Sequence, residues 1–457
     1  MEIDKLIYRA ESKTLEFKRD LSSITPILKT IVAFANTAGG ILIIGRSSDG
    51  SIEGIKDPFD AEERLANAIS DSIRPSILPE IEVATVEGKH LLVIQVAHWK
   101  GPFYLKSQGT PAGVYIRLGS TSRPVSADML AEMQRSIART SFDQEPVSEL
   151  TAENLDYERV KQAFIQMGKS VDRQKMRSLG LLTNFADRLV PSVGGLILFG
   201  NEEIRSRFVP DARVSCARFR GIDKTHIIDR YEIEGTILDA VTQVLNFIAR
   251  NTRLLADISA NRRTDIPEYP PLAIREALIN ALAHADYTIT GSHTRISIFS
   301  DRLEISNPGM LPFGYTLEDL IGGVSRVRNR VIVRTFRELD LMEEWGSGYR
   351  RIVSNCEEKG YPIPKWEEMA LSICVTFYPH PGTVLSDTSV SKELSARQQS
   401  VLALLNAEGV LSSREIAKLL GESISDRAIR YDLAHLKDLG MIKSVGRGSA
   451  TRWTSDM

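Results

Sequence analysis

The sequence predicts a multidomain protein of mixed α/β and α+β class, and three observations support this. Its 457 residues suffice for two to four domains at roughly 100–200 residues each. Strand-like and helix-like segments alternate over most of the chain, whereas the end of the chain has three helical segments and a hairpin. Polar stretches at 141–155 and 380–394 are typical of linkers. We therefore expect modules at 1–140, 156–380 and 395–457.

The composition excludes several classes of protein. Hydrophobic residues make up 42% and charged residues 25%, which is ordinary for a globular protein, and the net charge of -2 means that any basic surface is local. The chain has three cysteines, Cys216, Cys356 and Cys374, and no CxxC pair. This pattern argues against a disulfide framework or a zinc ribbon and favours a reducing compartment. The start lacks a signal-peptide core, and no apolar run approaches the roughly 18 residues of a membrane span. We expect a cytoplasmic protein with no membrane partner.

The first module alternates strands and helices. Residues 14–18 alternate polar and apolar side chains as a half-buried strand does, and 24–38 carry apolar residues at helical spacing up to Gly39-Gly40. The turn signal Ser48-Asp49-Gly50 predicts a hairpin. Further strands are expected at 41–45, 52–55, 91–97 and 114–117.

Carboxylates gather near the first strand. Glu16 and Lys18 share one strand face, Glu11 lies five residues before Glu16, and Asp49 follows the next strand. Three carboxylates and a lysine that converge could bind Mg²⁺ or Mn²⁺ and activate a water against phosphate. The same residues also suit a turn and a solvated strand face, so both interpretations stay open. Basic residues nearby could add phosphate contacts: Lys106, Arg117 and Arg123.

The segments ESKTLEFKRD and IVAFANTAGGILIIGRSSDGSIEGI resemble the Schlafen AlbA-type domain, over about residues 1–135. The resemblance implies an α/β module that binds nucleic acid. Some Schlafen proteins are RNA nucleases that use two Glu and one Asp around a metal. The resemblance places these at Glu11, Glu16 and Asp49, with Lys18 beside them. Binding without cleavage and metal-dependent cleavage both remain open.

The middle module also combines a sheet with helices. Residues 196–199 are expected as a strand and 295–299 with 303–306 as a hairpin, and helices are expected at 237–250, 272–284 and 329–339. The helix 272–284 is apolar almost all round, yet Glu276, Asn280 and His284 form one stripe at i, i+4 and i+8. Burying such a stripe costs free energy unless a partner satisfies it. A Mg²⁺-bound phosphate would do so.

Two further segments carry polar and glycine residues. Asn307 and Gly309 follow the hairpin strand, and Gly346-Ser347-Gly348 precedes a helical segment, where glycine amides make a phosphate cradle. Intervening arginines could also meet phosphate: Arg326, Arg328 and Arg330.

The run EALINALAHADY, then DRLEISNPGMLP, then EEWGSGYRR resembles the GHKL ATPase fold over about residues 160–380. It looks similar to the branch known in bacteria as RecG-like C-terminal or ATP-binding putative transcriptional regulators. The resemblance implies an α/β sandwich in which Glu276 activates water, Asn280 binds Mg²⁺ and the glycines hold ATP. Asn307 stands where most members have Asp, which weakens the expected contact to adenine. A degenerate domain used only for dimerisation or scaffolding remains the alternative. The chain has no GxxxxGK[ST] loop of a helicase motor.

The tail resembles the winged helix, with helices expected at 396–406, 412–420 and 425–439 and strands at 441–445 and 450–453. In that geometry the third helix enters the major groove and the wing contacts the backbone. The candidate contacts are Arg427, Arg430, Tyr431, Arg447 and Arg452. Nine Lys/Arg against seven Asp/Glu give 395–457 a charge of only +2, so contact with protein alone is the alternative.

Together these features predict an ATP-binding, DNA-binding regulator whose middle module controls two nucleic-acid-binding modules. The expected cofactors are ATP with Mg²⁺, and Mg²⁺ or Mn²⁺ at the first module. The expected partners are DNA or RNA and a second copy of the chain. The alternative is a metal-dependent nuclease for RNA, tRNA or phage nucleic acid, as in anti-phage defence. A scaffold whose winged helix meets only protein is a third hypothesis.

Overall fold

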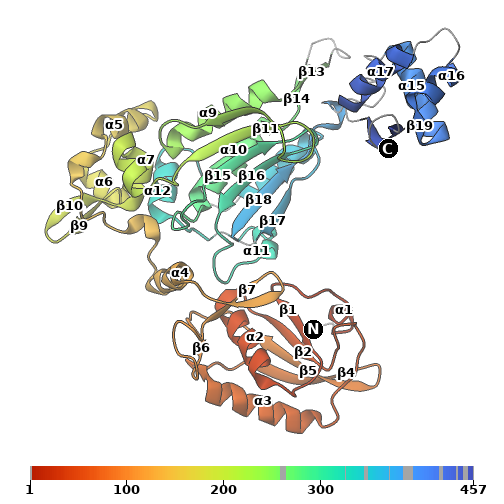
Figure 1. Cartoon of the computed structure of the whole chain (residues 1–457). Coiled ribbons are helices and arrows are strands. Elements are labelled where there is room, and N and C mark those ends of the chain that lie inside the picture. Colours follow the sequence, from red (N-terminus) through yellow and green to blue (C-terminus); the bar gives the residue numbers. More distant parts are fainter. Residues whose placement is uncertain are drawn as a thin grey trace. The chain divides into compact units, whose positions relative to one another are not determined.

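The structure is a computed structural model (Figure 1) that describes residues 3–257, 264–324, 326–343, 348–369, 371–383, 395–420, 426–438, 441–445 and 451–455. It divides into two compact units, residues 1–381 and 382–457, which are treated separately below. None of the helices in the described part of the chain combines the length and apolar character that crossing a bilayer requires.

The N-terminal module is built on a four-stranded sheet of order β1-β2-β5-β4. Strands β1 and β2 are parallel, and the other pairs are antiparallel. Helices α2 and α3 pack on one face of this sheet, and Gly39 ends α2 in the left-handed region with φ +76°, as the sequence predicts. The sheet strands are β1 (Leu15–Lys18), β2 (Gly40–Ile44), β4 (Glu80–Val86) and β5 (Lys89–Val96), and the helices are α1 (Ile3–Leu6), α2 (Ile24–Thr37) and α3 (Pro58–Ser72).

Short elements complete this module and lead out of it. Strand β3 pairs with β6, and β7 pairs with β8, both antiparallel. Helix α4 follows, with Ser126 as its N-cap and Arg139 in the left-handed conformation at its end. The bounds are β3 (Ile73–Arg74), β6 (Tyr104–Leu105), β7 (Tyr115–Leu118), β8 (Thr121–Pro124) and α4 (Ala127–Ala138).

The middle module is a six-stranded sheet of order β12-β11-β15-β16-β18-β17. Only β11 and β15 are parallel, and the remaining pairs are antiparallel. Helices α9 and α10 lie on this sheet (Figure 1), and side chains from the sheet and these helices form one large core cluster. The bounds are β11 (Val214–Phe219), β12 (Ile227–Glu232), α9 (Ile237–Asn251), α10 (Pro271–His284), β15 (Thr294–Ile298), β16 (Leu303–Pro308), α13 (Gly348–Glu358), β17 (Lys365–Met369) and β18 (Ser372–Phe377).

A helical subdomain packs beside this sheet and shares its core. It contains a two-stranded hairpin, and α12 packs against its helix α7. Two short strands, β13 and β14, pair with each other elsewhere in the module. The bounds are α5 (Tyr157–Gln166), α6 (Arg173–Leu179), β9 (Leu182–Phe185), β10 (Arg188–Pro191), α7 (Val193–Phe199), α8 (Glu202–Phe208), β13 (Leu254–Asp257), β14 (Thr264–Pro267), α11 (Leu317–Ile321) and α12 (Arg330–Glu338).

Three sequence-based expectations are wrong. Residues 196–199 belong to helix α7, which Ser192 caps by accepting from Gly195 N. A short apolar run cannot by itself distinguish a strand from a buried helix. Residues 52–55 form no strand, because only Ile52 makes an isolated bridge, to Arg46. The segment 141–155 is packed rather than a free linker, since Val147, Leu150 and Leu155 belong to the main core.

In the residues of the second unit that the structure describes, there are three helices and a three-stranded sheet of order β19-β21-β20. A small core of seven buried residues joins the helices to the sheet: Val401, Leu405, Ile416, Ile429, Leu433, Leu436 and Ile442. The arrangement confirms the expected winged-helix fold. The bounds are α15 (Ala396–Glu408), β19 (Leu411–Ser412), α16 (Ser413–Leu420), α17 (Asp426–Asp438), β20 (Ile442–Val445) and β21 (Arg452–Ser455).

Candidate functional site

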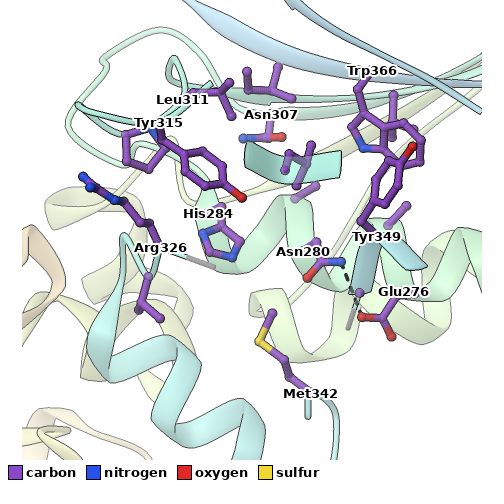
Figure 2. Close-up of a pocket in the computed structure, with 18 of the residues that line it drawn as sticks. Glu276, Asn280, His284, Asn307, Leu311, Tyr315, Arg326, Met342, Tyr349 and Trp366 are labelled. Atoms are coloured by element: carbon purple, nitrogen blue, oxygen red, sulfur yellow. Dashed lines mark hydrogen bonds between the residues drawn. The ribbon is translucent and has the colours of Figure 1, made fainter. Parts of the chain in front are cut away.

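The principal candidate site is a pocket in the middle module, here called the nucleotide pocket. It encloses about 1210 Å³ including the part open to solvent. Polar residues from α10 and β16 and aromatic residues from neighbouring elements line it (Figure 2). The residues that determine its chemistry are Glu276, Asn280, His284, Asn307, Tyr315, Arg326, Tyr349 and Trp366.

Helix α10 places three polar side chains along this pocket. The helix begins at Pro271, a position where proline costs no hydrogen bond, and nine of its side chains are buried. Its apolar residues face the sheet and α9, so the stripe of Glu276, Asn280 and His284 is left facing the pocket. The structure therefore brings together the three residues that the helical spacing predicted.

Glu276 and Asn280 meet the start of α13. Asn280 Nδ2 lies 3.4 Å from Glu276 Oε1, and Arg351 Nη1 lies 3.7 Å from Glu276 Oε2. A Cβ placed on Gly348 would lie 2.8 Å from Asn280 Nδ2 and 3.0 Å from Glu276 Oε1. Only glycine lets the start of α13 approach this pair so closely. Gly346 and Ser347, which the sequence also predicted to hold nucleotide, lie outside the described residues.

His284 lies at the C-terminal end of α10 and lines the same pocket. Burial, together with the nearby Arg328 guanidinium, lowers the pKa of His284 to about 4. The imidazole is therefore neutral at physiological pH and offers one donor and one acceptor to a ligand.

Asn307 lies at the end of β16 and is 7% exposed. Its Nδ2 donates to the Pro308 carbonyl at 3.2 Å, and its side chain lines the pocket (Figure 2). The chain then turns at Gly309, whose φ of +102° favours glycine. Both residues occupy the positions that the sequence predicted for a base-binding turn.

Aromatic side chains form much of the apolar wall. Tyr349 and Trp366 contact each other with ring centroids 4.8 Å apart, and both line the pocket. Tyr315 lines it from the loop between β16 and α11, and its hydroxyl donates to the Val324 carbonyl. Sequence reasoning did not select these three residues for the site. Their spacing in the chain follows no period, so only the fold reveals that they meet.

The carboxylates of the N-terminal module do not form the expected metal site. Within the described part of the chain, no group of three His, Cys, Asp or Glu side chains could hold a metal ion. Glu16 is 6% exposed and pairs with Lys18 and with Arg117, whose Nη1 lies 2.9 Å away. Arg117 is itself buried, so it neutralises a buried carboxylate and does not reach a phosphate.

The other two carboxylates have local structural roles. Glu11 Oε1 accepts from Phe17 N at 3.1 Å. Asp49 accepts from Ser51 N at 2.9 Å within its own turn, and the Ser51 hydrogen bonds lower the pKa of its carboxyl. The turn interpretation of Asp49-Gly50 therefore accounts for this residue.

The winged-helix unit presents part of its predicted contact set. Tyr431 is 73% exposed on α17 and Arg430 is exposed beside it. Arg452 on β21 is exposed, and its Nη2 lies 3.4 Å from Glu415 Oε1. Arg427 lies in α17, but its side chain is outside the described set, as is the whole of Arg447.

Comparison with known families finds a match within each of the three modules. Residues 11–126 match the Schlafen AlbA_2 family, and residues 291–377 match the C-terminal region of the putative ATP-dependent DNA helicase RecG. Residues 399–455 match the winged-helix domain of ribonuclease R. The chain joins an AlbA-type Schlafen module, a RecG-like C-terminal module and a winged helix.

Two solved structures are similar to parts of this chain or to all of it. The DIP2311 protein of Corynebacterium diphtheriae is 20% identical, with 99% of this chain and 96% of that chain covered and a TM-score of 0.43. The N-terminal domain of a putative ATP-dependent DNA helicase RecG-related protein from Nitrosomonas europaea is 30% identical, with 27% of this chain and 90% of that chain covered and a TM-score of 0.22. No curated protein matches the chain significantly.

The RecG-like match includes Asn307 and Gly309, and it begins after Glu276 and Asn280. The contact of Gly348 with the Glu276–Asn280 pair thus joins residues inside and outside the matched region. The AlbA match includes Glu11, Glu16, Lys18 and Asp49, although these residues form no metal group.

Proposed function

We propose that this chain is a nucleotide-dependent, nucleic-acid-binding regulator, and that its RecG-like module binds ATP with Mg²⁺ in the nucleotide pocket. The observation that carries the proposal is the close approach of Gly348 to Asn280 and Glu276. A glycine at that position lets the N-terminus of α13 lie directly against the two polar side chains of α10, and the N-terminus of a helix favours a phosphate group. The matched family of RecG C-terminal regions supports ATP as the ligand.

The residues present fit a nucleotide and its cation. Asn280 and Glu276 offer oxygen ligands of the kind that Mg²⁺ prefers, and Mg²⁺ completes its coordination with phosphate and water rather than with a protein cage. Asn307 offers an amide to the base, and the aromatic wall of Tyr315, Tyr349 and Trp366 excludes water around it. Bound Mg²⁺ would neutralise phosphate charge.

We propose binding without assigning hydrolysis. Glu276 already contacts the Asn280 amide and lies 3.7 Å from Arg351 Nη1, so its carboxylate is oriented by neighbours on α10 and α13. Asn307 gives a neutral acceptor where a carboxylate would give a charge-assisted hydrogen bond. Both features favour a module that senses nucleotide.

The pocket is connected to the AlbA module. Gly314, in the loop that lines the pocket, donates its N–H to the Thr37 carbonyl. Glu368 accepts from Leu311 N at 3.0 Å and from Lys13 Nζ at 2.8 Å. A ligand that moves this loop would therefore act on contacts with the AlbA module. This supports a role in which nucleotide changes how nucleic acid is held.

Calorimetry with ATP and Mg²⁺ tests the proposal on the full chain. We expect wild type to bind, and Asn280→Ala to weaken binding more than about tenfold, because it removes a contact to a charged group. Asn246→Ala is the matched control, since Asn246 is exposed on α9 away from the pocket. Equal affinities for wild type and Asn280→Ala would exclude this site.

Titration of labelled DNA and RNA then tests the regulatory part. We expect ATP to change the affinity of wild type for nucleic acid and to leave that of Asn280→Ala unchanged. An identical affinity with and without ATP in wild type would show that nucleotide does not control nucleic-acid binding.

A further inference from the structure

A second recess adjoins the nucleotide pocket, and its lining is dominated by arginine. We call it the arginine recess. It encloses about 1100 Å³ including the part open to solvent. Six arginine side chains line it: Arg139, Arg326, Arg328, Arg330, Arg334 and Arg337.

Helix α12 supplies three of these arginines for a clear physical reason. Its apolar side chains, among them Val331, Ile332 and Phe336, are buried in the core. Arg330, Arg334 and Arg337 occur at i, i+4 and i+7, so they share the opposite face. The helix is thus held by its apolar face while it presents a row of guanidinium groups.

The position of Arg139 relative to this row is also fixed. Arg139 follows α4, and two residues later Ser141 begins a turn that Asp143 anchors on α12. Asp143 is fully buried and accepts from the backbone N–H groups of Arg330, Val331 and Ile332 at 2.7–3.1 Å. Arg139 is therefore held beside the start of the row.

The recess holds an excess of positive charge. Among the residues that the structure describes, its one acidic lining residue is Glu132, which already accepts from Arg135 at 3.1 and 3.3 Å. Arg328 pairs with Asp286 at 3.0 Å, whereas no ion pair within the described residues involves Arg139, Arg330 or Arg334. Like charges gathered in a recess repel one another, and a bound anion relieves that repulsion. The charge distribution indicates a binding site for an anion.

The shape of the basic surface indicates an extended anion. The row from Arg330 to Arg337 is about 10 Å long at 1.5 Å per residue. Beyond it, Arg334 and Arg337 also line a neighbouring recess, where Lys169 and Lys175 are already paired with Asp340 and Glu338. The row is long enough to contact more than one phosphate of a strand.

We propose that the arginine recess binds the phosphate backbone of a single nucleic-acid strand. The groups suited to nucleotide phosphate, Glu276, Asn280 and Gly348, line the nucleotide pocket and do not line the arginine recess. Figure 2 shows Arg326 across the pocket from Glu276. The triphosphate would thus have a place of its own, and Arg139, Arg330 and Arg334 can contact a second ligand.

The two sites share a wall. Arg326 and Arg337 line both, together with Pro312, Val327 and Val333. Any coupling between strand and nucleotide through this wall is reciprocal, since each ligand changes the affinity of the other by the same factor. Only this coupling depends on the proposed function, because strand binding itself does not require ATP.

The test measures single-strand affinity with the full chain by fluorescence anisotropy of a labelled oligothymidylate, over a range of salt concentrations. We expect Arg330→Gln/Arg334→Gln to lower affinity about tenfold and to reduce the slope of log K against log salt by about 1.4, which corresponds to two phosphate contacts. Arg330→Lys/Arg334→Lys should restore most of the slope. Arg207→Gln, which removes one exposed arginine on α8 outside the recess, is the surface-charge control and should change neither quantity.

Calorimetry with ATP on the same variants separates the two sources of phosphate. The proposal predicts lost strand affinity with unchanged ATP affinity. Lost ATP affinity with unchanged strand affinity would assign the arginines to nucleotide phosphates and overturn the proposal. The proposal would also be overturned if Arg330→Gln/Arg334→Gln lowered strand affinity by no more than Arg207→Gln does. If wild type binds the strand through these arginines but binds no ATP, the proposed nucleotide function is wrong, whereas the proposal that the arginine recess binds a nucleic-acid strand is supported.

Discussion

Asp143 is the residue whose removal should damage the RecG-like module most clearly. It lies in the polar stretch that the sequence suggested was a linker, yet it is fully buried. Its Oδ2 accepts from Val331 N at 2.7 Å and Ile332 N at 3.0 Å, and its Oδ1 accepts from Arg330 N at 3.1 Å. The carboxylate satisfies three of the four N–H groups that a helix start leaves without partners.

The expected magnitude follows from these contacts. A buried donor left without an acceptor costs about 1–3 kcal/mol, so three donors set a range of about 3–9 kcal/mol. Water can reach part of the first turn of α12 after the side chain is truncated, so we expect Asp143→Ala to cost about 3 kcal/mol. Asp156→Ala is the matched control, because exposed Asp156 caps α5 through one bond to Arg159 N at 3.0 Å. The control should cost about 1 kcal/mol.

Hydrogen exchange of the full chain measures the expected loss of stability at α12. It is detected by mass spectrometry on peptides that cover residues 330–338. A loss of about 3 kcal/mol corresponds to exchange about 100-fold faster in these peptides. Asp156→Ala should accelerate exchange in α5 and leave α12 unchanged. If Asp143→Ala left the α12 peptides as protected as in wild type, the buried cap would contribute nothing and the argument would fail.

Three further predictions concern other parts of the chain. The pKa of His284 in the folded protein is about 4 against an ordinary 6.5, so the unfolded state binds more protons between these values. The free energy of unfolding is therefore highest above pH 6.5 and falls by up to about 3 kcal/mol as the pH drops towards 4. In His284→Gln, the melting temperature should depend less on pH over this range. Arg117→Ala leaves the buried carboxylate of Glu16 with Lys18 as its remaining ion-pair partner among the described residues, so the free energy of unfolding should fall by about 3 kcal/mol, measured by urea denaturation; a loss below about 1 kcal/mol would contradict the buried pair. Tyr431→Ala removes a side chain that is 73% exposed, so DNA affinity should fall about tenfold while the melting temperature holds, and unchanged affinity would exclude this face as the reader.

The sequence predicted elements well where periodicity and end signals agree. The helix 272–284 appears as α10 (Pro271–His284), and the hairpin 295–306 appears as β15 and β16. In both cases, the residues on one face of the element pack against the same neighbouring elements along its whole length, so burial follows the period of the sequence. The polar stripe of α10 could be placed on one face for the same reason.

The errors arose where tertiary contacts decide the outcome. The apolar run 196–199 is helical because it is enclosed on every side by the core, which removes any amphipathic signal. The stretch 141–155 is polar by composition, but Asp143 is buried because the start of α12 needs acceptors. Glu16 pairs with Lys18, which the strand period places on the same face, and with Arg117, which lies 101 positions further along the chain, so no local pattern could show this second pair.

Two asparagines of the RecG-like module show how structural and functional polar groups can be distinguished. Asn329 is 1% exposed and donates to the Ala283 and Ala285 carbonyls at 3.0 and 2.8 Å, so the fold satisfies its amide. Asn280 makes a single long contact of 3.4 Å to Glu276, and it faces a cavity. Burying a polar group costs free energy unless the group forms hydrogen bonds. Neighbouring polar side chains that lack hydrogen-bond partners within the protein therefore occur mainly where a ligand supplies those hydrogen bonds. The contrast supports the proposal that the polar residues of α10, Asn280 among them, contact a ligand.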